Sequence, residues 1–135
     1  MPGTKLDRKA EEFVMGVHFG KLATVNRDGS PQLTPVWYLY ERGLFVINTA
    51  TDRLKYRNIR RDPRVALLID EGYSYVAVKG NARIARERDG NKDIETLAIR
   101  YLGEERGRKQ ARELYWKQKR VTIEIEPLRV LCSLP

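Results

Sequence analysis

The chain has 135 residues, of which 41% are hydrophobic and 33% charged, and its 26 Lys and Arg against 18 Asp and Glu give a net charge of +8. This length predicts one domain over residues 1–135, and the apolar fraction excludes a disordered chain. No apolar run approaches the roughly 18 to 20 residues of a membrane helix, and the first residues lack a secretory pattern, so we expect a cytoplasmic protein without a membrane partner.

The counts of cysteine and histidine exclude several kinds of chemistry. Cys132 is the single cysteine and His18 the single histidine. An intrachain disulfide is therefore impossible, and no metal site is expected. We expect both residues to pack or to form hydrogen bonds, so any redox chemistry would be carried by a bound cofactor.

The first predicted element is an amphipathic helix. Apolar residues recur at helical spacing from Leu6 to Val14, and Thr4 with Asp7 resembles a capping pair. Past Gly16 the pattern changes to that of β-strands.

Three strands are predicted next. Segments 21–25 and 32–40 are rich in β-forming residues and are separated by turn residues at 26–29, which predicts a hairpin. A third strand at 44–47 would complete a three-stranded meander. Pro35 lies inside the second strand, and because proline cannot donate to a ladder it predicts an edge, a bulge or a face left unpaired for a ligand.

The rest of the chain alternates between helices and strands. Predicted helices span residues 51–60, 94–102 and 104–119, and predicted strands span residues 65–69, 73–85 and 121–126, the last extending over 129–132 after a kink at Pro127. Thr51 or Asp52 is expected to cap the first of these helices. Six strands with inserted helices predict a mainly β fold, a small antiparallel barrel rather than a parallel βαβ sheet.

The densest basic stretch spans residues 53–64, with six basic residues and one acid. Arg53 and Lys55 follow the end of a strand that carries Asn48, Thr49 and Thr51. Hydroxyls, backbone N–H groups and two cations can converge there on one anion such as a phosphate. The alternative, a solvated helix face, stays open on composition alone.

Several segments, in order and spacing, resemble the pyridoxamine 5′-phosphate oxidase-like split-barrel superfamily, most closely its branch of small flavin- and deazaflavin-dependent oxidoreductases. The matching segments are 22–26, 28–32, 34–37, 48–50, 53–55, Asn58, 61–66, 101–103 and 121–127. The resemblance implies a six-stranded antiparallel split barrel that forms a homodimer, with two cofactor sites at the subunit interface.

The resemblance also implies a set of cofactor-binding residues. Arg53 and Lys55, with Thr49 and Thr51, would hold the phosphate, and Thr34, Pro35, Val36 and Trp37 would lie against the ring. Asn48, in the matching segment 48–50, belongs to the same cofactor-binding set. Gln32 would point into the same site. Asn58 would either support the phosphate loop or have the simpler role of helix capping or hydrogen bonding.

The implied activity is hydride transfer between the bound cofactor and a small organic substrate. The cofactor would be F420, preferred because its anionic tail suits a basic cleft, or FMN. No catalytic acid or base stands out; Tyr38 or Tyr75 is a candidate proton donor, although packing is favoured for both. The alternatives are an FMN-binding protein of the same superfamily, a cofactor carrier without turnover and, more remotely, a nucleic-acid-binding barrel, which we do not expect.

The sequence departs from this branch at the charged segment 104–119. It would cover the site, contact an anionic cofactor tail or be solvated, and we favour the solvated face.

Overall fold

A computed structural model of the chain describes residues 6–135, in which seven strands form one antiparallel sheet rather than the six strands expected. The order of the strands is β2-β1-β5-β6-β7-β4-β3. Their bounds are β1 Gly20–Val25, β2 Pro31–Val36, β3 Leu39–Glu41, β4 Leu44–Ala50, β5 Arg64–Glu71, β6 Ser74–Ile84 and β7 Arg120–Ser133. The seventh strand arises because the predicted second strand divides into β2 and β3.

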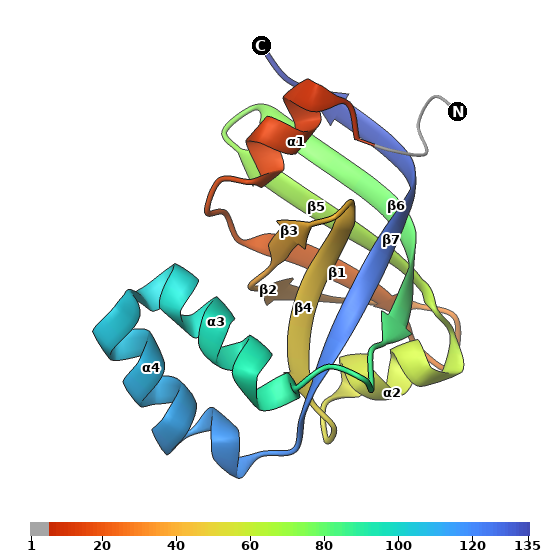
Figure 1. Cartoon of the computed structure of the whole chain (residues 1–135). Helices are drawn as coiled ribbons and strands as arrows, with labels where there is room; N and C mark the ends of the chain where they lie inside the picture. Colours follow the sequence, from red (N-terminus) through yellow and green to blue (C-terminus); the bar gives the residue numbers. More distant parts are fainter. Residues whose placement is uncertain (1–5) are drawn as a thin grey trace.

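The sheet curls because its two edge strands are neighbours in the chain. β2 and β3 lie at opposite edges, yet only Trp37 and Tyr38 separate them. Three residue steps reach at most about 10 Å, so the edges come together and the sheet forms a half-barrel (Figure 1).

The predicted hairpin of β1 and β2 is confirmed, whereas the predicted continuous meander is wrong. Its middle strand is interrupted where the Tyr38 side chain turns into the core and its backbone N–H donates to the hydroxyl of Tyr101 at 3.1 Å. Pro35 lies on β2, which pairs only with β1, so the prediction of an edge position is confirmed.

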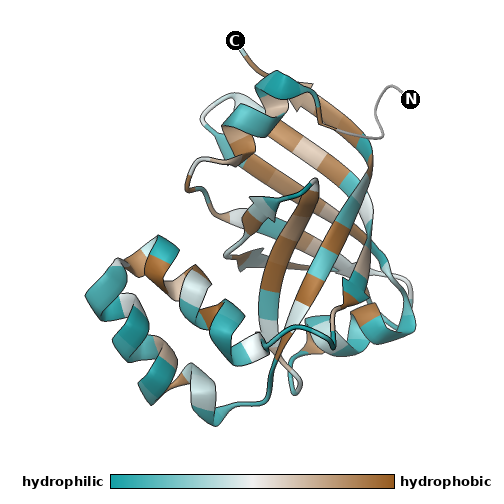
Figure 2. Cartoon of the chain, in the orientation of Figure 1, coloured by the Kyte–Doolittle hydropathy of each residue, from teal (hydrophilic) through white to brown (hydrophobic). Residues whose placement is uncertain are grey.

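The concave side of the sheet holds the hydrophobic core, visible as brown segments on the strands in Figure 2. Its largest fully buried side chains are Leu22, Tyr38, Phe45, Ile47, Leu67, Ile69, Ile123 and Ile125. The alternation predicted for β6 is confirmed, since Val76 and Val78 are buried and Lys79 is exposed.

The kink predicted at Pro127 occurs inside a continuous β7. The register between β6 and β7 shifts there, since Gly80 faces Pro127 whereas Lys79 faces Arg129, which leaves Leu128 as the extra residue of a bulge. A Cβ atom at Gly80 would collide with the carbonyl oxygen of Glu126, so the close approach of the two strands requires glycine.

Helices close the two ends of the half-barrel. α1 (Arg8–Val14) lies at the top of Figure 1 and α2 (Leu54–Arg61) at the bottom. The side chain of Asp7 caps α1 by accepting from the Ala10 N–H at 2.9 Å. Thr4, the other member of the expected capping pair, lies outside the described residues. No helix among residues 6–135 is both long and apolar enough to span a membrane.

The α3–α4 hairpin stands beside the sheet rather than across its ends (Figure 1). α3 (Gly90–Leu102) ends at Gly103, as predicted, and α4 (Glu104–Glu113) follows directly. The helix predicted over 104–119 is too long, because α4 ends at Glu113 and the chain continues after Leu114 as a 3₁₀ turn, η1 (Tyr115–Lys117).

The segment 104–119 is not merely a solvated face. Gly107 of α4 is buried against Ala98 of α3, so closely that a Cβ atom on Gly107 would lie 2.5 Å from the Ala98 carbonyl. Arg112 donates to Glu95 at 3.0 Å, and the indole N–H of Trp116 donates to the Asn91 carbonyl at 2.9 Å. The segment therefore packs on α3, although its charged residues are all exposed to solvent.

A cationic and aromatic pocket as candidate functional site

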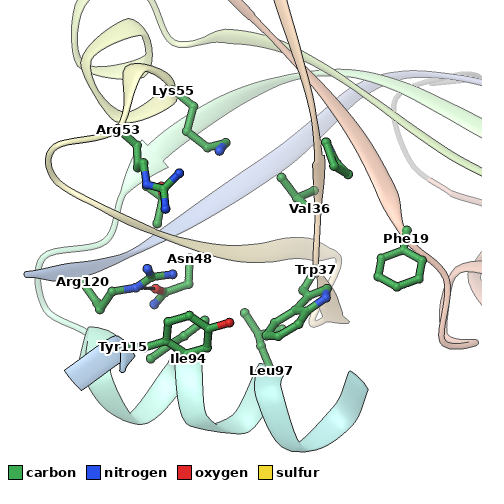
Figure 3. Close-up of a pocket in the computed structure, with 12 residues that line it drawn as sticks. Phe19, Val36, Trp37, Asn48, Arg53, Lys55, Ile94, Leu97, Tyr115 and Arg120 are labelled. Carbon is green, nitrogen blue, oxygen red and sulfur yellow. Dashed lines mark hydrogen bonds between the residues drawn. The ribbon is translucent and has the colours of Figure 1, made fainter. Parts of the chain in front are cut away.

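A pocket of about 300 Å³ lies between the curved sheet and the α3–η1 region (Figure 3). Its wall combines residues that are far apart in the sequence, from β2, β4, α2, α3, η1 and the start of β7. They are Phe19, Pro35, Val36, Trp37, Asn48, Thr49, Arg53, Lys55, Ile94, Leu97, Tyr115 and Arg120. Its volume is at the lower end of the range for small-molecule sites.

One end of the pocket is cationic. Arg53 and Lys55 reach it from the start of α2, and Arg120 reaches it from the start of β7 (Figure 3). None of the three forms an ion pair within residues 6–135, and the wall contains no carboxylate. Burial lowers the pKa of the Lys55 ammonium, and the neighbouring charges of Arg53 and Arg120 lower it further.

The uncompensated charge favours an anionic ligand. Like charges held close together and partly buried destabilise one another, and an anion placed among them would relieve that repulsion. The start of α2 adds to the positive potential, because helix N-termini present backbone N–H groups without helical partners. The cap predicted at Thr51 or Asp52 is wrong: Arg53 occupies the N-cap position, and no side chain caps this end of α2.

Asn48 and Thr49 lie at the end of β4, beside the cations. The Asn48 side chain donates to the Gly90 carbonyl at 2.9 Å and accepts from Arg120 Nε at 2.9 Å, so it links α3 to the cationic end. Thr49 is only 3% exposed, and its hydroxyl has no hydrogen-bond partner among the described residues. It is free to donate to a ligand in the pocket.

The opposite end of the pocket is apolar and aromatic. Trp37 stacks on Tyr101, with ring centroids 5.4 Å apart, and Tyr115 meets the indole edge-on at 6.2 Å. Ile94 and Leu97 of α3 supply the aliphatic part of the wall. A flat, conjugated ring system fits such a surface, since aromatic faces and aliphatic side chains contact it without leaving polar groups unpaired.

The structure brings together seven of the eleven predicted site residues. The seven that line the pocket are Pro35, Val36, Trp37, Asn48, Thr49, Arg53 and Lys55, and the four that do not are Gln32, Thr34, Thr51 and Asn58.

Asn58 and Gln32 belong to a buried polar network beneath α2. Asn58 is 1% exposed and donates to Thr24 at 3.0 Å and to Asn26 at 2.9 Å, while the Thr24 hydroxyl donates to Gln32 at 3.1 Å. Hydrogen bonding within the fold, one of the two interpretations left open for Asn58, is observed. The network also fixes α2 on β1, and so the position of Lys55.

Thr34 and Thr51 differ in their surroundings. The hydroxyl oxygen of Thr34 is buried and has no partner among the described residues. The Thr51 N–H donates to the Lys119 carbonyl at 3.0 Å, which joins the start of the α2 loop to the residue before β7.

Neither tyrosine considered as a proton donor lines the pocket. The Tyr38 hydroxyl donates to the Val14 carbonyl at 2.6 Å, and burial raises the pKa of this phenol above its ordinary value. Tyr75 lies on β6 and pairs with Ser133 of β7. Tyr115 is the tyrosine in the wall, and its hydroxyl accepts from Gln110 at 2.7 Å.

Five wall residues were missed by sequence reasoning: Phe19, Ile94, Leu97, Tyr115 and Arg120. Arg120 left no usable signal in the sequence, because it reaches the pocket through the antiparallel pairing of β7 with β4, in which it lies opposite Ala50. Ile94 and Leu97 fall in the helix predicted over 94–102, although their contact with a pocket was not expected.

The two remaining candidates are accounted for by packing or by position. His18 stacks on Phe13 at 4.8 Å and forms hydrogen bonds with the Phe13 carbonyl at 3.1 Å and with Glu71 at 3.2 Å. Cys132 is exposed near the end of β7, so the expectation of a packed cysteine is wrong.

The family model described as pyridoxamine 5′-phosphate oxidase matches residues 6–132. A solved structure of an F420 reductase superposes with a TM-score of 0.72 at 25% identity, covering 93% of this chain and 98% of the other.

Two further solved structures are similar. A conserved hypothetical protein from Mycobacterium tuberculosis superposes with a TM-score of 0.74 at 28% identity, covering 96% of this chain and 86% of the other. The heme storage protein HutZ from Vibrio cholerae superposes at 0.70 with 16% identity, covering 95% of this chain and 94% of the other. At that identity the likeness shows the fold alone.

Proposed function

The chain belongs to the pyridoxamine 5′-phosphate oxidase family, and we propose that it is an oxidoreductase transferring hydride between a flavin-type cofactor and a small organic substrate. The observation that carries this proposal is the division of one pocket into a cationic end and an aromatic end. A cofactor with a phosphate and a flat ring system matches both ends at once.

The residues of the pocket fit such a cofactor. Arg53 and Lys55 would hold the phosphate, helped by the unpartnered hydroxyl of Thr49. Val36 and Trp37 would contact the ring beside the outer edge of β2, whose backbone groups pair with no other strand. When bound, the cofactor supplies the hydride chemistry, so the protein needs only to bind, orient and exclude water.

We propose F420 as the preferred cofactor, with FMN second. The cationic end holds three positive side chains, more than the charge of about −1.5 to −2 on a phosphate monoester requires. A cofactor with further anionic groups in its tail would use the remaining charge, and the similarity to an F420 reductase supports the same preference.

The protein is proposed to work as a homodimer. The convex face of the sheet exposes Leu33 on β2 and Leu131 on β7, 68% and 66% accessible, and a hollow of about 500 Å³ lies on this face beside Ala23 and Ala66. Exposed apolar surface of this kind is typical of protein contacts. A second copy of the chain would cover it.

The hydride-transfer proposal is tested by mixing the protein with reduced F420 or reduced FMN and a panel of quinones, enones and tetrapyrrole-like acceptors. Faster oxidation of the cofactor than in free solution, for at least one acceptor, supports an enzyme. Tight binding of the cofactor without acceleration for any acceptor identifies a carrier instead and contradicts the oxidoreductase proposal.

A further inference from the structure

We propose that Arg120 is a third cationic ligand of the phosphoryl group, completing a cluster with Arg53 and Lys55. The inference rests on the proposed function in taking this pocket as the cofactor site. It adds a ligand from β7, a strand that was not expected to take part in phosphate binding. The ligand chemistry is a phosphoryl group, whether the monoester of FMN or the diester of F420.

Arg120 is held in place before any ligand arrives. Its Nε donates to the Asn48 side chain at 2.9 Å, and Nη1 donates to Gln118 at 2.6 Å. Its guanidinium lies over the ring of Tyr115, 5.0 Å from the centroid. These contacts fix the planar fork, and within residues 6–135 they leave Nη2 without a hydrogen-bond partner.

The direction of the side chain points to a shared ligand. Figure 3 shows the guanidinium groups of Arg120 and Arg53 and the ammonium of Lys55 converging on the same end of the pocket. They approach from two elements, α2 and β7, so an anion between them would be contacted from two sides. A guanidinium with a purely structural role would be stabilised more by a carboxylate than by two neutral amide oxygens.

The electrostatic cost of this arrangement indicates a ligand rather than a structural role. Arg120 is half-buried, and no carboxylate among the described residues pairs with it. Burial lowers the pKa of its guanidinium; the nearby Tyr115 opposes this shift, the charge of Arg53 adds to it, and Asp52, which forms no ion pair with Arg120, opposes it more weakly. Arg88, which is also half-buried, avoids this cost by pairing with Asp93 at 2.9 Å and with Glu124 at 3.1 Å, whereas the half-buried Arg100 donates only to the backbone carbonyls of Met15 and Gly16.

The test compares each cofactor with its own phosphate-free core. Binding of FMN and riboflavin, and of F420 and its 8-hydroxy-5-deazariboflavin core, is measured by fluorescence titration of the full chain. We expect Arg120→Gln to weaken binding of the phosphorylated cofactor about 10- to 100-fold, as loss of a charge-assisted hydrogen bond predicts. Binding of the matching core should change less than twofold.

Two variants serve as controls. Arg106→Gln removes the same charge from an exposed position on α4 outside the pocket and should leave all four affinities unchanged. Arg120→Lys keeps the charge without the fork and should bind the phosphorylated cofactor with intermediate affinity. Equal weakening of cofactor and core in Arg120→Gln, or no weakening at all, overturns the proposal.

A separate measurement distinguishes failure of this inference from failure of the proposed function. If the unaltered protein binds neither cofactor nor core, thermal unfolding is followed with and without inorganic phosphate. A rise in Tm with phosphate that is lost in Arg120→Gln but kept in Arg106→Gln supports the anion site while refuting the cofactor. The same rise in both variants, or none in the unaltered protein, refutes the role of Arg120.

Discussion

The indole of Trp37 lies flat against the phenol of Tyr101, with ring centroids 5.4 Å apart and planes inclined by 8°. The Tyr101 hydroxyl donates to the His18 carbonyl at 2.5 Å and accepts from the Tyr38 N–H at 3.1 Å. The Tyr101 side chain of α3 therefore stabilises the interruption between β2 and β3 and also fixes Trp37 in the aromatic wall of the pocket.

The two roles of Tyr101 are separable by substitution. Tyr101→Phe keeps the ring but leaves the Tyr38 N–H without a partner, so the free energy of unfolding should fall by about 1–3 kcal/mol while the affinity for the cofactor stays within twofold. Tyr101→Ala removes the stack as well and should weaken binding of the riboflavin or deazaflavin core. Urea unfolding and fluorescence titration measure the two effects; an equal loss of core affinity in both variants would contradict the assignment.

Gly107 should not tolerate even one added carbon. Replacing glycine by alanine stabilises an isolated helix by about 1 kcal/mol. At position 107, however, the added Cβ would lie 2.5 Å from the Ala98 carbonyl. We expect Gly107→Ala to lower the free energy of unfolding by at least about 2 kcal/mol, and to weaken cofactor binding by displacing Tyr115. Lys109→Ala, at an exposed position on the same helix, is the control. A stabilised Gly107→Ala variant would show that α3 and α4 do not pack this closely.

The start of α3 is tied to the sheet by a network around Arg88, which pairs with Glu124 of β7 and Asp93 of α3. Burial opposes the charge on Glu124, but hydrogen bonds from Arg83 and Arg88 outweigh it, so the pKa of this carboxyl is below its ordinary value. A lowered carboxyl pKa stabilises the fold above the unfolded pKa near 4.5, and this stability is lost as the pH falls through the folded pKa.

Glu124→Gln should therefore lower the free energy of unfolding by about 1–3 kcal/mol at pH 7, because Arg88 and Arg83 each lose a charged partner while Arg88 keeps Asp93. The difference from the unaltered protein should shrink as the pH falls below 4, where the native carboxylate also becomes protonated. Urea unfolding at pH 7 and pH 3 measures both values. A difference that is the same at the two pH values would assign the loss to packing instead of charge.

The convex face provides a test of the proposed dimer. Leu131→Glu places a charge on an exposed apolar position of β7, and we expect it to convert a dimer into a monomer in light scattering after gel filtration. Tyr73→Glu, at a fully exposed turn between β5 and β6, should leave the mass unchanged. A monomeric unaltered protein at micromolar concentration would refute the homodimer.

The sequence allowed most elements to be predicted because local signals and tertiary packing agree in them. The alternation of Val76 and Val78 with Lys79 and the terminating Gly103 both occur as expected. The break at Trp37 was missed because β-forming residues continue through it, and the interruption comes from Tyr101, 64 positions later in the chain. Such a contact leaves no local pattern.

The candidate site could likewise be predicted only in part, because some of its residues are brought together by distant contacts. Arg53, Lys55, Asn48 and Thr49 are close in the sequence, and their residue types made an anion site one of the two interpretations, beside a solvated helix face. Tyr115 and Arg120 reach the pocket only because η1 packs on α3 and β7 pairs with β4. From its sequence, the charged segment 104–119 resembles a solvated helix, so the face that packs on α3 could not be recognised.

The central claim is that the cationic end of this pocket binds the phosphate of a flavin-type cofactor. The most direct measurement is a fluorescence titration of the purified full chain with F420 and with FMN, beside the variant carrying Arg53→Ala and Lys55→Ala. We predict saturable binding of at least one cofactor by the unaltered chain, weakened at least 100-fold in the variant, with the phosphate-free core bound equally by both. Absence of binding of either cofactor to the unaltered chain, or equal affinity in the variant, would contradict the claim.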